Sequence, residues 1–511
     1  MSLNNRHDNR IEGVLLAALL FCLLILSLYR LESYPAPWFD EGLPLQAAKN
    51  VALEGQYGLR TTEGMVLFHP AIQTGPTVLL PIALMVRLVG ADMFTARLMM
   101  VGYALIALVV FYGLVRYLNG WKTALLAGVL LLSTFDHEYT SFVYMGRQVL
   151  AEVPALAFFW SGTWLWLRAW SGPGRLRVAW AGLLWGLAMV TKVQFAFVLP
   201  AALILFWLLD RLFHKRLTTL QVILPLLVSG SCVVAWYGYQ AITVGPVHYW
   251  QQMTELGAAG GVHFFSFSTR QMARAISQLS GSVLLLLGLP GMLYIVLASL
   301  KRREDVRQLQ QVFLAAFTAV WLAWYAFLSI GWMRYAFVPA AIGTVFAARL
   351  LHDLWRWAGG DDKIDRRLWV TPGQFALAGI VAMLLFSGLL PLARQFITYP
   401  DSGLQEMAEY LNRYIPTDQT IESWEWEADF LTEHSYHHPP YAVTNAVTAA
   451  IWYKEQMPPD LYDPLEFEPI YLLNGPFAKW TGIYAQVLQE NRGARIVSLG
   501  QYDLYRINND E

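Results

Sequence analysis

Apolar segments of membrane-spanning length recur along most of this chain, and they leave few folds open to it. About 20 apolar residues are needed to cross a hydrocarbon core as a helix, and in lipid the backbone must satisfy its own hydrogen bonds. Charged residues make up only 14% of the sequence, roughly half their usual share in soluble proteins. The sequence therefore predicts a mainly α-helical polytopic membrane protein with about eleven transmembrane helices. The candidate spans are residues 11–29, 97–116, 121–139, 153–170, 178–191, 194–210, 218–240, 279–300, 309–329, 334–352 and 374–393.

One shorter apolar run, residues 76–90, decides the topology. It contains Pro81 and Arg87. If this run does not span, the basic loops of the chain fall on the same side as the N-terminus, which is the positive-inside pattern. If it does span, these loops move to the opposite side, so we predict a juxtamembrane helix lying along the outer membrane face. The basic loops hold Arg116 and Lys122; Arg168, Arg175 and Arg177; Arg211, Lys215 and Arg216; Lys301, Arg302 and Arg303; and Lys363, Arg366 and Arg367.

This topology predicts a multi-pass protein of the plasma (inner) membrane, with a cytoplasmic N-terminus and an external C-terminal region. We interpret residues 1–394 as a transmembrane domain. Residues 395–511 have clustered charge and interrupted apolar runs, which predicts a small external α/β domain of ordinary size. Periodicity in this domain predicts helices over 402–414 and 478–491, and strands over 469–476, 494–500 and 502–507.

Charged residues gather at the predicted outer ends of the spans. Asp40 and Glu41 follow the first span in YPAPWFDEG, and Arg147 and Glu152 lie in YMGRQVLAEVPA. Taken alone, the acidic pair is also typical of a solvated turn or a helix cap. Arg147 and Glu152 could equally form an interfacial ion pair.

Two further cations, Lys192 and Arg334, lie at other outer boundaries. A long cationic side chain at a helix end often extends to the interface without further function. All six charges nevertheless belong to one predicted rim, which suits a reaction between a phosphate-bearing lipid and a polar acceptor. A carboxylate there could remove the acceptor proton, and cations could neutralise the departing phosphate.

Several histidines and one acidic stretch have less specific interpretations. His69 begins the short run, where an interfacial ring is the simpler explanation. His434, His437 and His438 in HSYHHPP have zinc-like spacing without an evident fourth ligand, so a polar loop is favoured over a zinc site. The stretch WEWEAD (424–429) is interpreted as a solvated acidic face or loop.

The motifs as a set resemble the GT-C class of membrane glycosyltransferases. The resemblance is carried by WFDEG after the first span, FHPAIQTGP before a juxtamembrane helix, YMGRQVLAEVPALAFF, GLLWGLAMVTK and RYAFVP, in the expected order over most of residues 10–350. It is strongest for the group that includes protein O-mannosyltransferase-like enzymes and the bacterial aminoarabinose and lipopolysaccharide-core sugar transferases. The C-terminal region resembles the variable external domains of such enzymes only loosely.

The resemblance implies an enzyme that moves a hexosyl or pentosyl group from a polyprenyl-phosphate donor to an acceptor at the outer membrane face. Matched by motif, Asp40 is the catalytic base, with Glu41 beside it and Glu152 where the family often has Asp. The matched residues for the donor phosphate and substrate are Arg147, Lys192, Arg334, Tyr335 and His69, with Ala71 in place of the usual second proline.

The cofactor and the acceptor stay open at this stage. Some GT-C enzymes use a divalent metal and others do not; Asp40 and Glu152 are the residues that would hold one here. The acceptor is a lipid, a glycan or a protein, and the net charge of −1 argues against nucleic acid.

Three other functions compete with this one. A lipid or sugar transporter or flippase would place its charges at mid-membrane, often in interrupted helices. A membrane scaffold would leave Asp40 dispensable. A glycan ligase or polymerase would rely on basic residues in a long late loop.

Overall fold

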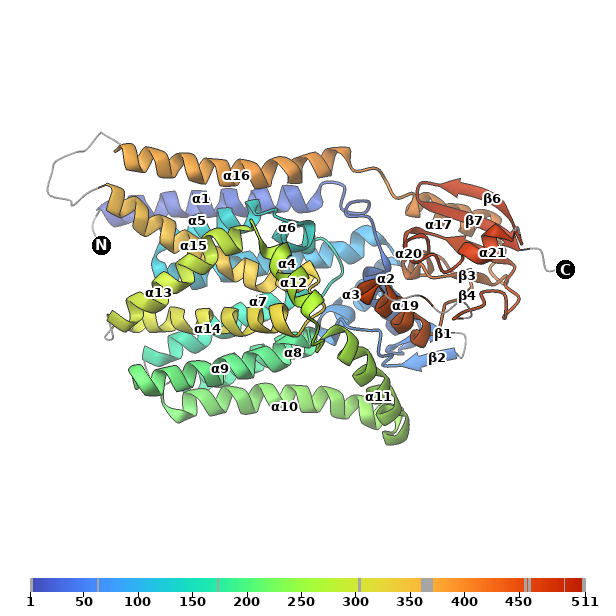
Figure 1. Ribbon diagram of the computed structural model, residues 1–511, viewed down its shortest axis with the longest axis horizontal. Helices are drawn as coiled ribbons and strands as arrows, with labels where there is room; N and C mark the ends of the chain where they lie inside the picture. The colour runs from blue at the N-terminus through green and yellow to red at the C-terminus, as the bar shows by residue number, and fades with distance from the viewer. Residues whose placement is uncertain are drawn as a thin grey trace.

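Each apolar run predicted to span the membrane folds as a helix in the computed structural model, which describes residues 3–61, 64–171, 174–301, 305–359, 371–454, 457, 461–490 and 492–507. These helices form a bundle with a small sheet at one end (Figure 1). They are α1 (Leu3–Leu28), α4 (Met93–Asn119), α5 (Trp121–Ser133), α7 (Glu152–Arg168), α8 (Arg175–Thr191), α9 (Gln194–Phe213), α10 (Thr219–Val244), α13 (Leu289–Lys301), α14 (Val306–Phe327), α15 (Phe337–Ala358) and α16 (Pro372–Thr398).

Length and composition qualify eight helices as candidate spans among the described residues. The helices α5, α7 and α8 are shorter, with 13, 17 and 17 residues. A π-helical turn, η3 (Leu284–Gly288), continues into α13 and completes the run predicted at 279–300. The predicted class, a polytopic helical membrane protein with a small C-terminal α/β region, is confirmed. Of the predicted basic loops, Arg302, Arg303 and residues 363–367 lie outside the described residues.

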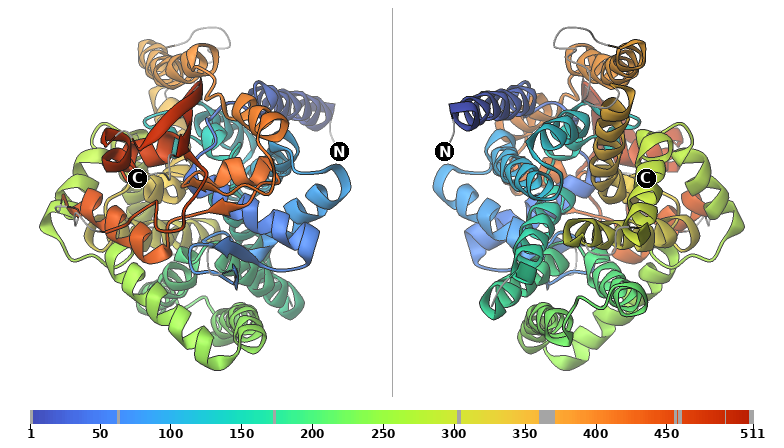
Figure 2. Two further views of the ribbon diagram at one scale, coloured as in Figure 1. Left: turned by 90° about the vertical axis from the view of Figure 1, so that its right-hand side faces the viewer. Right: turned by 90° about the vertical axis from the view of Figure 1, so that its left-hand side faces the viewer.

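Burial separates inner helices from peripheral ones. In the most apolar window of each helix, 83% of the α15 residues and 72% of the α14 residues are buried, against 11% for α16 and 17% for α10. The end-on views in Figure 2 place α10 and α16 at the edge of the bundle. The inner contacts are aromatic: Trp160, Trp166 and Trp185 are fully buried. Apolar side chains on the outer helices therefore suit a lipid environment.

Local signals explain where several helices begin and end. Asp92 caps α4 by accepting from the backbone N–H of Thr95 at 2.7 Å. Thr218 and Thr371 form capping boxes at the starts of α10 and α16. Gly120 separates α4 from α5 with φ of 86°, a conformation that glycine adopts without steric cost.

The stretch between the first two long helices folds at the sheet end of the bundle. It contains α2 (Phe39–Glu54), the hairpin β1 (Gly58–Thr61) and β2 (Gly64–Leu67), and α3 (Pro76–Val89). Helix α3 is the short run predicted at 76–90, and it shares an apolar core with α2, the start of α4 and residues of the C-terminal region. It therefore belongs to the layer between bundle and sheet.

The C-terminal region is an α/β unit, as predicted. Its sheet has the order β4-β3-β5-β7-β6, with β3 parallel to β4 and β5, and β7 antiparallel to β5 and β6. The strands are β3 (Ile421–Ser423), β4 (Tyr436–His437), β5 (Tyr471–Asn474), β6 (Gly493–Leu499) and β7 (Tyr502–Ile507). The helices are α17 (Leu404–Tyr414), α18 (Trp426–Leu431), α19 (Tyr441–Tyr453), α20 (Pro476–Thr481) and α21 (Ala485–Gln489).

Two predictions for this region were wrong. The segment 478–491 was expected to form one helix, but the structure has two short helices, because Gly482 ends α20 with φ of 72°. The stretch WEWEAD was expected to be solvated, yet Glu425 and Glu427 are fully buried. Its last four residues begin α18, and that short helix packs against α2.

A glycine makes this contact between α18 and α2 possible. A Cβ atom added at Gly42 would lie 2.5 Å from the backbone nitrogen of Glu427. The glycine of WFDEG thus lets the C-terminal region approach the helix that carries the acidic pair. The remaining short elements are η1 (Glu138–Thr140), α6 (Phe142–Met145), η2 (Ala169–Ser171), α11 (Pro246–His263), α12 (Thr269–Leu279) and η4 (Met333–Ala336).

Candidate active site

Four of the predicted site residues converge at the sheet end of the bundle. Asp40 lies in the first turn of α2, Glu152 begins α7, Lys192 follows α8, and Arg334 lies in η4. Because each side chain stands where an element begins or ends, residues separated by up to 294 positions can meet at one point.

Arg334 is the centre of this cluster. Its Nη1 donates to Asp40 Oδ2 at 2.5 Å, and its Nε and Nη2 donate to the Glu152 carboxylate at 2.6 and 3.1 Å. Lys192 Nζ lies 2.9 Å from Glu152 Oε1. Two cations thus balance two carboxylates, as buried charges require.

The four groups differ in access to solvent. The side chains of Glu152, Lys192 and Arg334 are between 3% and 6% exposed, whereas that of Asp40 is 29% exposed. Asp40 and Arg334 line a cavity of about 110 Å³, and Glu152 is not among its lining residues. Asp40 is therefore the carboxylate of the cluster that a bound molecule can contact, and Glu152 holds the two cations in place.

The environment also sets the basicity of Asp40. Burial raises the pKa of Asp40 above its ordinary value, although the charges of Arg334 and Lys192 act in the opposite direction. In its ionised form, a carboxylate with a raised pKa is a stronger base than an ordinary aspartate.

Two tryptophans enclose the Arg334 guanidinium. Its Cζ lies 5.9 Å from the ring centroid of Trp38 and 5.3 Å from that of Trp332. Trp38 is held by a 2.8 Å hydrogen bond from its Nε1 to Gln148 Oε1. Such ring contacts stabilise a cation and restrict its orientation.

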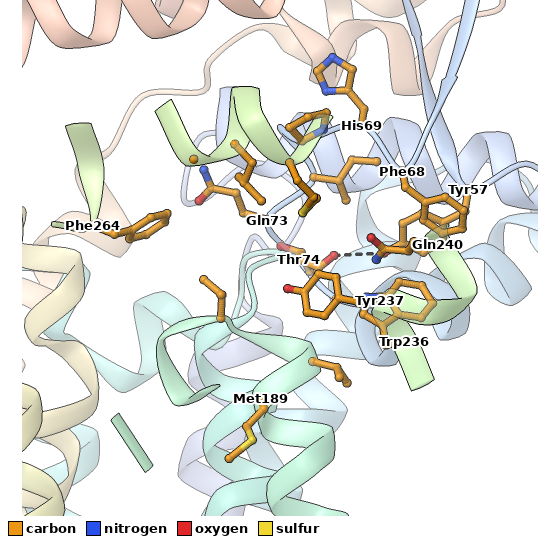
Figure 3. Close-up of a pocket in the computed structure, with 18 of the residues that line it drawn as sticks. Tyr57, Phe68, His69, Gln73, Thr74, Met189, Trp236, Tyr237, Gln240 and Phe264 are labelled. Carbon is orange, nitrogen blue, oxygen red and sulfur yellow. Dashed lines mark hydrogen bonds between the residues drawn. The ribbon is translucent and has the colours of Figure 1, made fainter. Parts of the chain in front are cut away.

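A second, larger cavity of about 310 Å³ adjoins the first. The two share Gln73 and Thr74 as lining residues. Figure 3 shows Tyr57, Phe68 and Trp236 on one side of the larger cavity. Met189 lies below them in this view, and Phe264 lies on the opposite side. Its lining is largely apolar and comes from the segment before α3 and from α8 to α11.

The loop that joins the two cavities is fixed against α8. The backbone N–H of Gly75 donates to the carbonyl of Thr191 at 3.1 Å. A Cβ at Gly75 would lie 1.8 Å from the carbonyl oxygen of Val190. This close approach places the TGP sequence beside Lys192, which follows Thr191 directly.

Two predicted site residues lie elsewhere. Glu41 is fully buried and forms a bidentate pair with Arg97, at 2.8 Å from Nε and 2.5 Å from Nη2. It also accepts from the backbone N–H of Val149 at 2.9 Å. These contacts engage both carboxylate oxygens and connect α2 to α4 and to the loop before α7. The geometry therefore indicates a structural role for Glu41.

Arg147 likewise points away from the cluster. Its Nη1 and Nη2 donate to the carbonyls of Leu26 and Tyr29 at 2.9 and 2.5 Å. Its guanidinium lies 4.6 Å from the ring of Phe396. The side chain thus closes the C-terminal end of α1, and the alternative Arg147–Glu152 pair is absent because Glu152 binds Arg334 and Lys192.

His69 and Tyr335 lie beside the cavities without joining the ion cluster. His69 lines the larger cavity, and burial lowers its pKa to about 4, so the ring is neutral at physiological pH. Its ring packs edge-on against Tyr441 at 5.3 Å. Tyr335 lines the smaller cavity.

The three later histidines are buried within the C-terminal region, in a stretch that is loop except for the short strand Tyr436–His437. His434 Nε2 contacts the carbonyl of Ile415 at 3.0 Å, and His438 lies 3.1 Å from Asp429 Oδ2. His437 pairs with the buried Glu422. No cluster of three or more potential metal ligands occurs among the described residues.

The outer wall of the smaller cavity was not predicted from the sequence. That wall is α19, which contributes several polar side chains from a segment that reads as weakly apolar. The turn residues Gln73 and Thr74 were also missed, although they stand inside the quoted FHPAIQTGP motif. The wall residues from α19 are Tyr441, Thr444, Asn445, Thr448 and Trp452.

Comparison with known proteins agrees with this fold. Residues 69–236 match the family model for dolichyl-phosphate-mannose-protein mannosyltransferase. The structure is similar to that of ArnT from Cupriavidus metallidurans bound to undecaprenyl phosphate, with a TM-score of 0.61, 12% sequence identity and 98% of each chain covered.

A second similar structure is an archaeal one. The oligosaccharyltransferase of Archaeoglobus fulgidus, tethered to an acceptor peptide, has a TM-score of 0.59 at 12% identity, covering 98% of this chain and 74% of that one. The same enzyme in complex with an inhibitory peptide and a dolichol-phosphate has a TM-score of 0.58. No curated protein matches the sequence significantly. The chain has the fold of the GT-C membrane glycosyltransferases, which confirms the predicted resemblance.

Proposed function

We propose that this GT-C protein transfers a sugar from a polyprenyl-phosphate donor to an acceptor at the outer face of the plasma membrane. The observation that carries the proposal is Asp40, bound to Arg334 at the boundary of a small polar cavity that adjoins a larger apolar one. The similar structures with bound undecaprenyl phosphate and dolichol-phosphate support a lipid-phosphate donor.

The larger cavity suits the prenyl chain of such a donor. Aromatic and aliphatic side chains dominate its lining, and it lies among α8, α9, α10 and α11. A lipid held there extends its phosphate toward Gln73 and Thr74, where the two cavities meet. Tethering in the membrane also lowers the entropic cost of bringing donor and acceptor together.

The ion cluster supplies the charges that the reaction needs. Asp40 accepts the proton of the acceptor as the acceptor atom forms its bond to the anomeric carbon. The bond from that carbon to the phosphate oxygen breaks, and the electron pair leaves with the polyprenyl phosphate. Arg334 and Lys192 stabilise the negative charge that grows on this leaving group.

The position of the site supports an outer-face reaction. The N-terminus lies at the end of the bundle opposite the sheet (Figure 1), and the positive-inside pattern assigns the N-terminal end to the cytoplasm. Asp40 lies at the sheet end, so this orientation exposes it to the exterior.

Transport is the competing function. A transporter is expected to carry its key charges near mid-membrane. The buried cluster of Asp40, Glu152, Lys192 and Arg334 instead lies at element ends beside α2, next to the C-terminal region. This placement favours glycosyl transfer.

Transfer in proteoliposomes tests the proposal. The wild type, Asp40→Asn and the exposed control Asp418→Asn receive radiolabelled polyprenyl-phosphate sugars and a mixed acceptor extract. We expect label to move to acceptor with the wild type and the control, and to fall by about 100-fold or more with Asp40→Asn, the usual cost of losing a general base.

Two other outcomes of this experiment would contradict the proposed role of Asp40 or the proposed function. Equal turnover by Asp40→Asn would remove Asp40 from the chemistry and leave Glu152 as the carboxylate to test. If no donor is consumed while labelled lipid crosses the bilayer, the protein is a transporter.

A further inference from the structure

The smaller cavity has a wall that belongs to the C-terminal region. Tyr441, Thr444, Asn445 and Thr448 of α19 line it together with Asp40. Their spacing of three and four residues places them on one face of the helix. The opposite face carries Val443 and Val447, which belong to an apolar core that the C-terminal region shares with α2 and α3.

Helix α19 is fixed to the bundle through its C-terminal end. The carbonyl of Trp452 accepts from Gln271 Nε2 at 3.1 Å and from Arg274 Nη2 at 3.4 Å. The guanidinium of Arg274 also lies 5.1 Å from the Trp452 ring. Cationic donors at the end of a helix satisfy its last carbonyls, so α12 holds α19 at a defined distance from the membrane helices.

The chemistry of this wall is uncharged and can donate or accept hydrogen bonds. Threonine hydroxyls and the asparagine amide supply both donors and acceptors. Tyr441 and Asn445 lie one turn apart on the same face of the helix. The Thr448 hydroxyl donates to the Thr444 carbonyl at 2.5 Å and keeps its lone pairs free to accept.

Aromatic side chains complete the cavity. The rings of Trp332 and Trp452 lie 5.9 Å apart, and Phe39 lines the same space. Flat apolar surfaces beside neutral hydrogen-bonding groups match a sugar ring, which presents C–H faces and a rim of hydroxyls. An anion would favour a cationic wall instead, and α19 contributes no charged side chain to this cavity.

The order of the two cavities indicates that the sugar bound in the smaller cavity is the one carried by the donor. A prenyl chain in the larger cavity places its phosphate at the Gln73–Thr74 junction, and the smaller cavity begins there. The group that follows the phosphate in the donor is the sugar to be transferred. It would lie between Asp40 and α19.

We propose that the polar face of α19 binds the hydroxyls of the transferred sugar and determines which sugar the enzyme accepts. This inference rests on the proposed function. It makes Thr444, Asn445 and Thr448 specificity-determining residues, supplied by the C-terminal region to a reaction whose base lies on α2.

Donor competition tests the inference. Purified wild type and the variants Thr444→Val, Asn445→Ala and Thr448→Val are given undecaprenyl phosphate carrying mannose, glucose or arabinose, together with singly deoxygenated analogues. The best wild-type donor is compared with its deoxy analogues as a ratio of kcat/KM. We expect the wild type to discriminate against at least one analogue, and one variant to reduce that discrimination about 10-fold or more, since it lacks the partner of the missing hydroxyl.

Controls separate recognition from folding. Thr254→Val on α11 removes an exposed threonine with the same intrahelical bond, to the Trp250 carbonyl at 2.9 Å, and is expected to leave the ratio unchanged. Thr444→Ser keeps the hydroxyl and is expected to restore the wild-type ratio. Thermal unfolding in detergent verifies that each variant is folded.

Failure of the inference is distinguishable from failure of the proposed function. If the wild type transfers sugar and all three variants keep its donor preference, the inference is wrong. A change confined to the KM for the acceptor would also overturn it and assign α19 to acceptor binding. Absence of transfer by the wild type from every donor would reject the proposed function itself.

Discussion

At the scale of single residues, the adjacent acids Asp40 and Glu41 have different roles because a helix turns by about 100° per residue. Asp40 faces Arg334 and the smaller cavity, while Glu41 faces inward and binds Arg97. Sequence proximity suggested that the two would act together. The helical turn of α2 instead sends one carboxylate to the site and the other to the core.

Replacing each acid separately tests whether Glu41 supports stability and Asp40 supports transfer. Glu41→Gln is expected to lower the free energy of unfolding by about 3–5 kcal/mol, since it leaves the buried Arg97 guanidinium without a countercharge. The folded fraction should retain transfer. Asp40→Asn, in contrast, should lose transfer and stay close to wild-type stability. Thermal unfolding in detergent and transfer per folded molecule measure the two effects; a Glu41→Gln protein of normal stability without activity would contradict this assignment.

The pH dependence of transfer reports on Asp40. Its base form is the active one, and its pKa is raised above its ordinary value, by burial first of all. The value of kcat/KM should therefore fall as the pH drops through this raised pKa, at a higher pH than an ordinary aspartate would give. Lys192→Met removes one of the charges that lower this pKa, so its acidic limb should move to higher pH. A limb that stays in place would show that another group titrates.

At the scale of elements, the site depends on close contacts between helices that meet near their ends. Gly75 at the start of α3 donates to Thr191 at the end of α8, with no room for a Cβ. Gly42 allows the same approach between α2 and α18. Gly75 thus sets α3 against the helix that precedes Lys192, and Gly42 sets the helix that carries Asp40 against the C-terminal region.

A glycine-to-alanine pair tests the α3–α8 contact. Gly75→Ala is expected to separate the two helices, to lower the unfolding temperature and to reduce transfer, because its Cβ would overlap the Val190 carbonyl. Gly102→Ala within α4 adds a methyl group to open space and should be neutral or slightly stabilising. Equal behaviour of the two variants in thermal unfolding and transfer would reject the contact.

At the scale of the whole molecule, the C-terminal region and the bundle pack together as one structural unit. They share an apolar core, the α2–α18 contact and the walls of the smaller cavity. Two buried acids, Glu425 and Glu427, lie at this junction. Burial and the neighbouring charge of Glu425 raise the pKa of Glu427 well above its ordinary value. Tyr502 donates to Glu427 at 3.0 Å.

Stability of the molecule should consequently depend on pH. A carboxyl group with a raised pKa binds more protons in the folded state than in the unfolded state, so the free energy of unfolding falls as the pH rises above the unfolded value. This loss is expected to continue up to the folded pKa of Glu427. Glu427→Gln should reduce the slope and raise stability at alkaline pH, whereas the exposed control Glu406→Gln should not. Unfolding in detergent across pH 5 to 9 measures both; an unchanged slope in Glu427→Gln would refute the explanation.

The sequence by itself determined the membrane class, the helices and the GT-C resemblance. Lipid imposes these features locally, since a span must have a certain length, an apolar composition and a hydrogen-bonded backbone. Motifs at the ends of those spans also identified Asp40, Glu152, Lys192 and Arg334, which the structure brings together.

Only the tertiary structure decided how each charge is used. Glu41 and Arg147 lie close in sequence to site residues, yet each binds partners far along the chain. The burial of WEWEAD and the position of α19 over Asp40 likewise depend on how the C-terminal region packs on α2 and α12. Local patterns specify an element and its apolar face, whereas the partner of a polar side chain is set by packing between distant segments, which no local pattern contains.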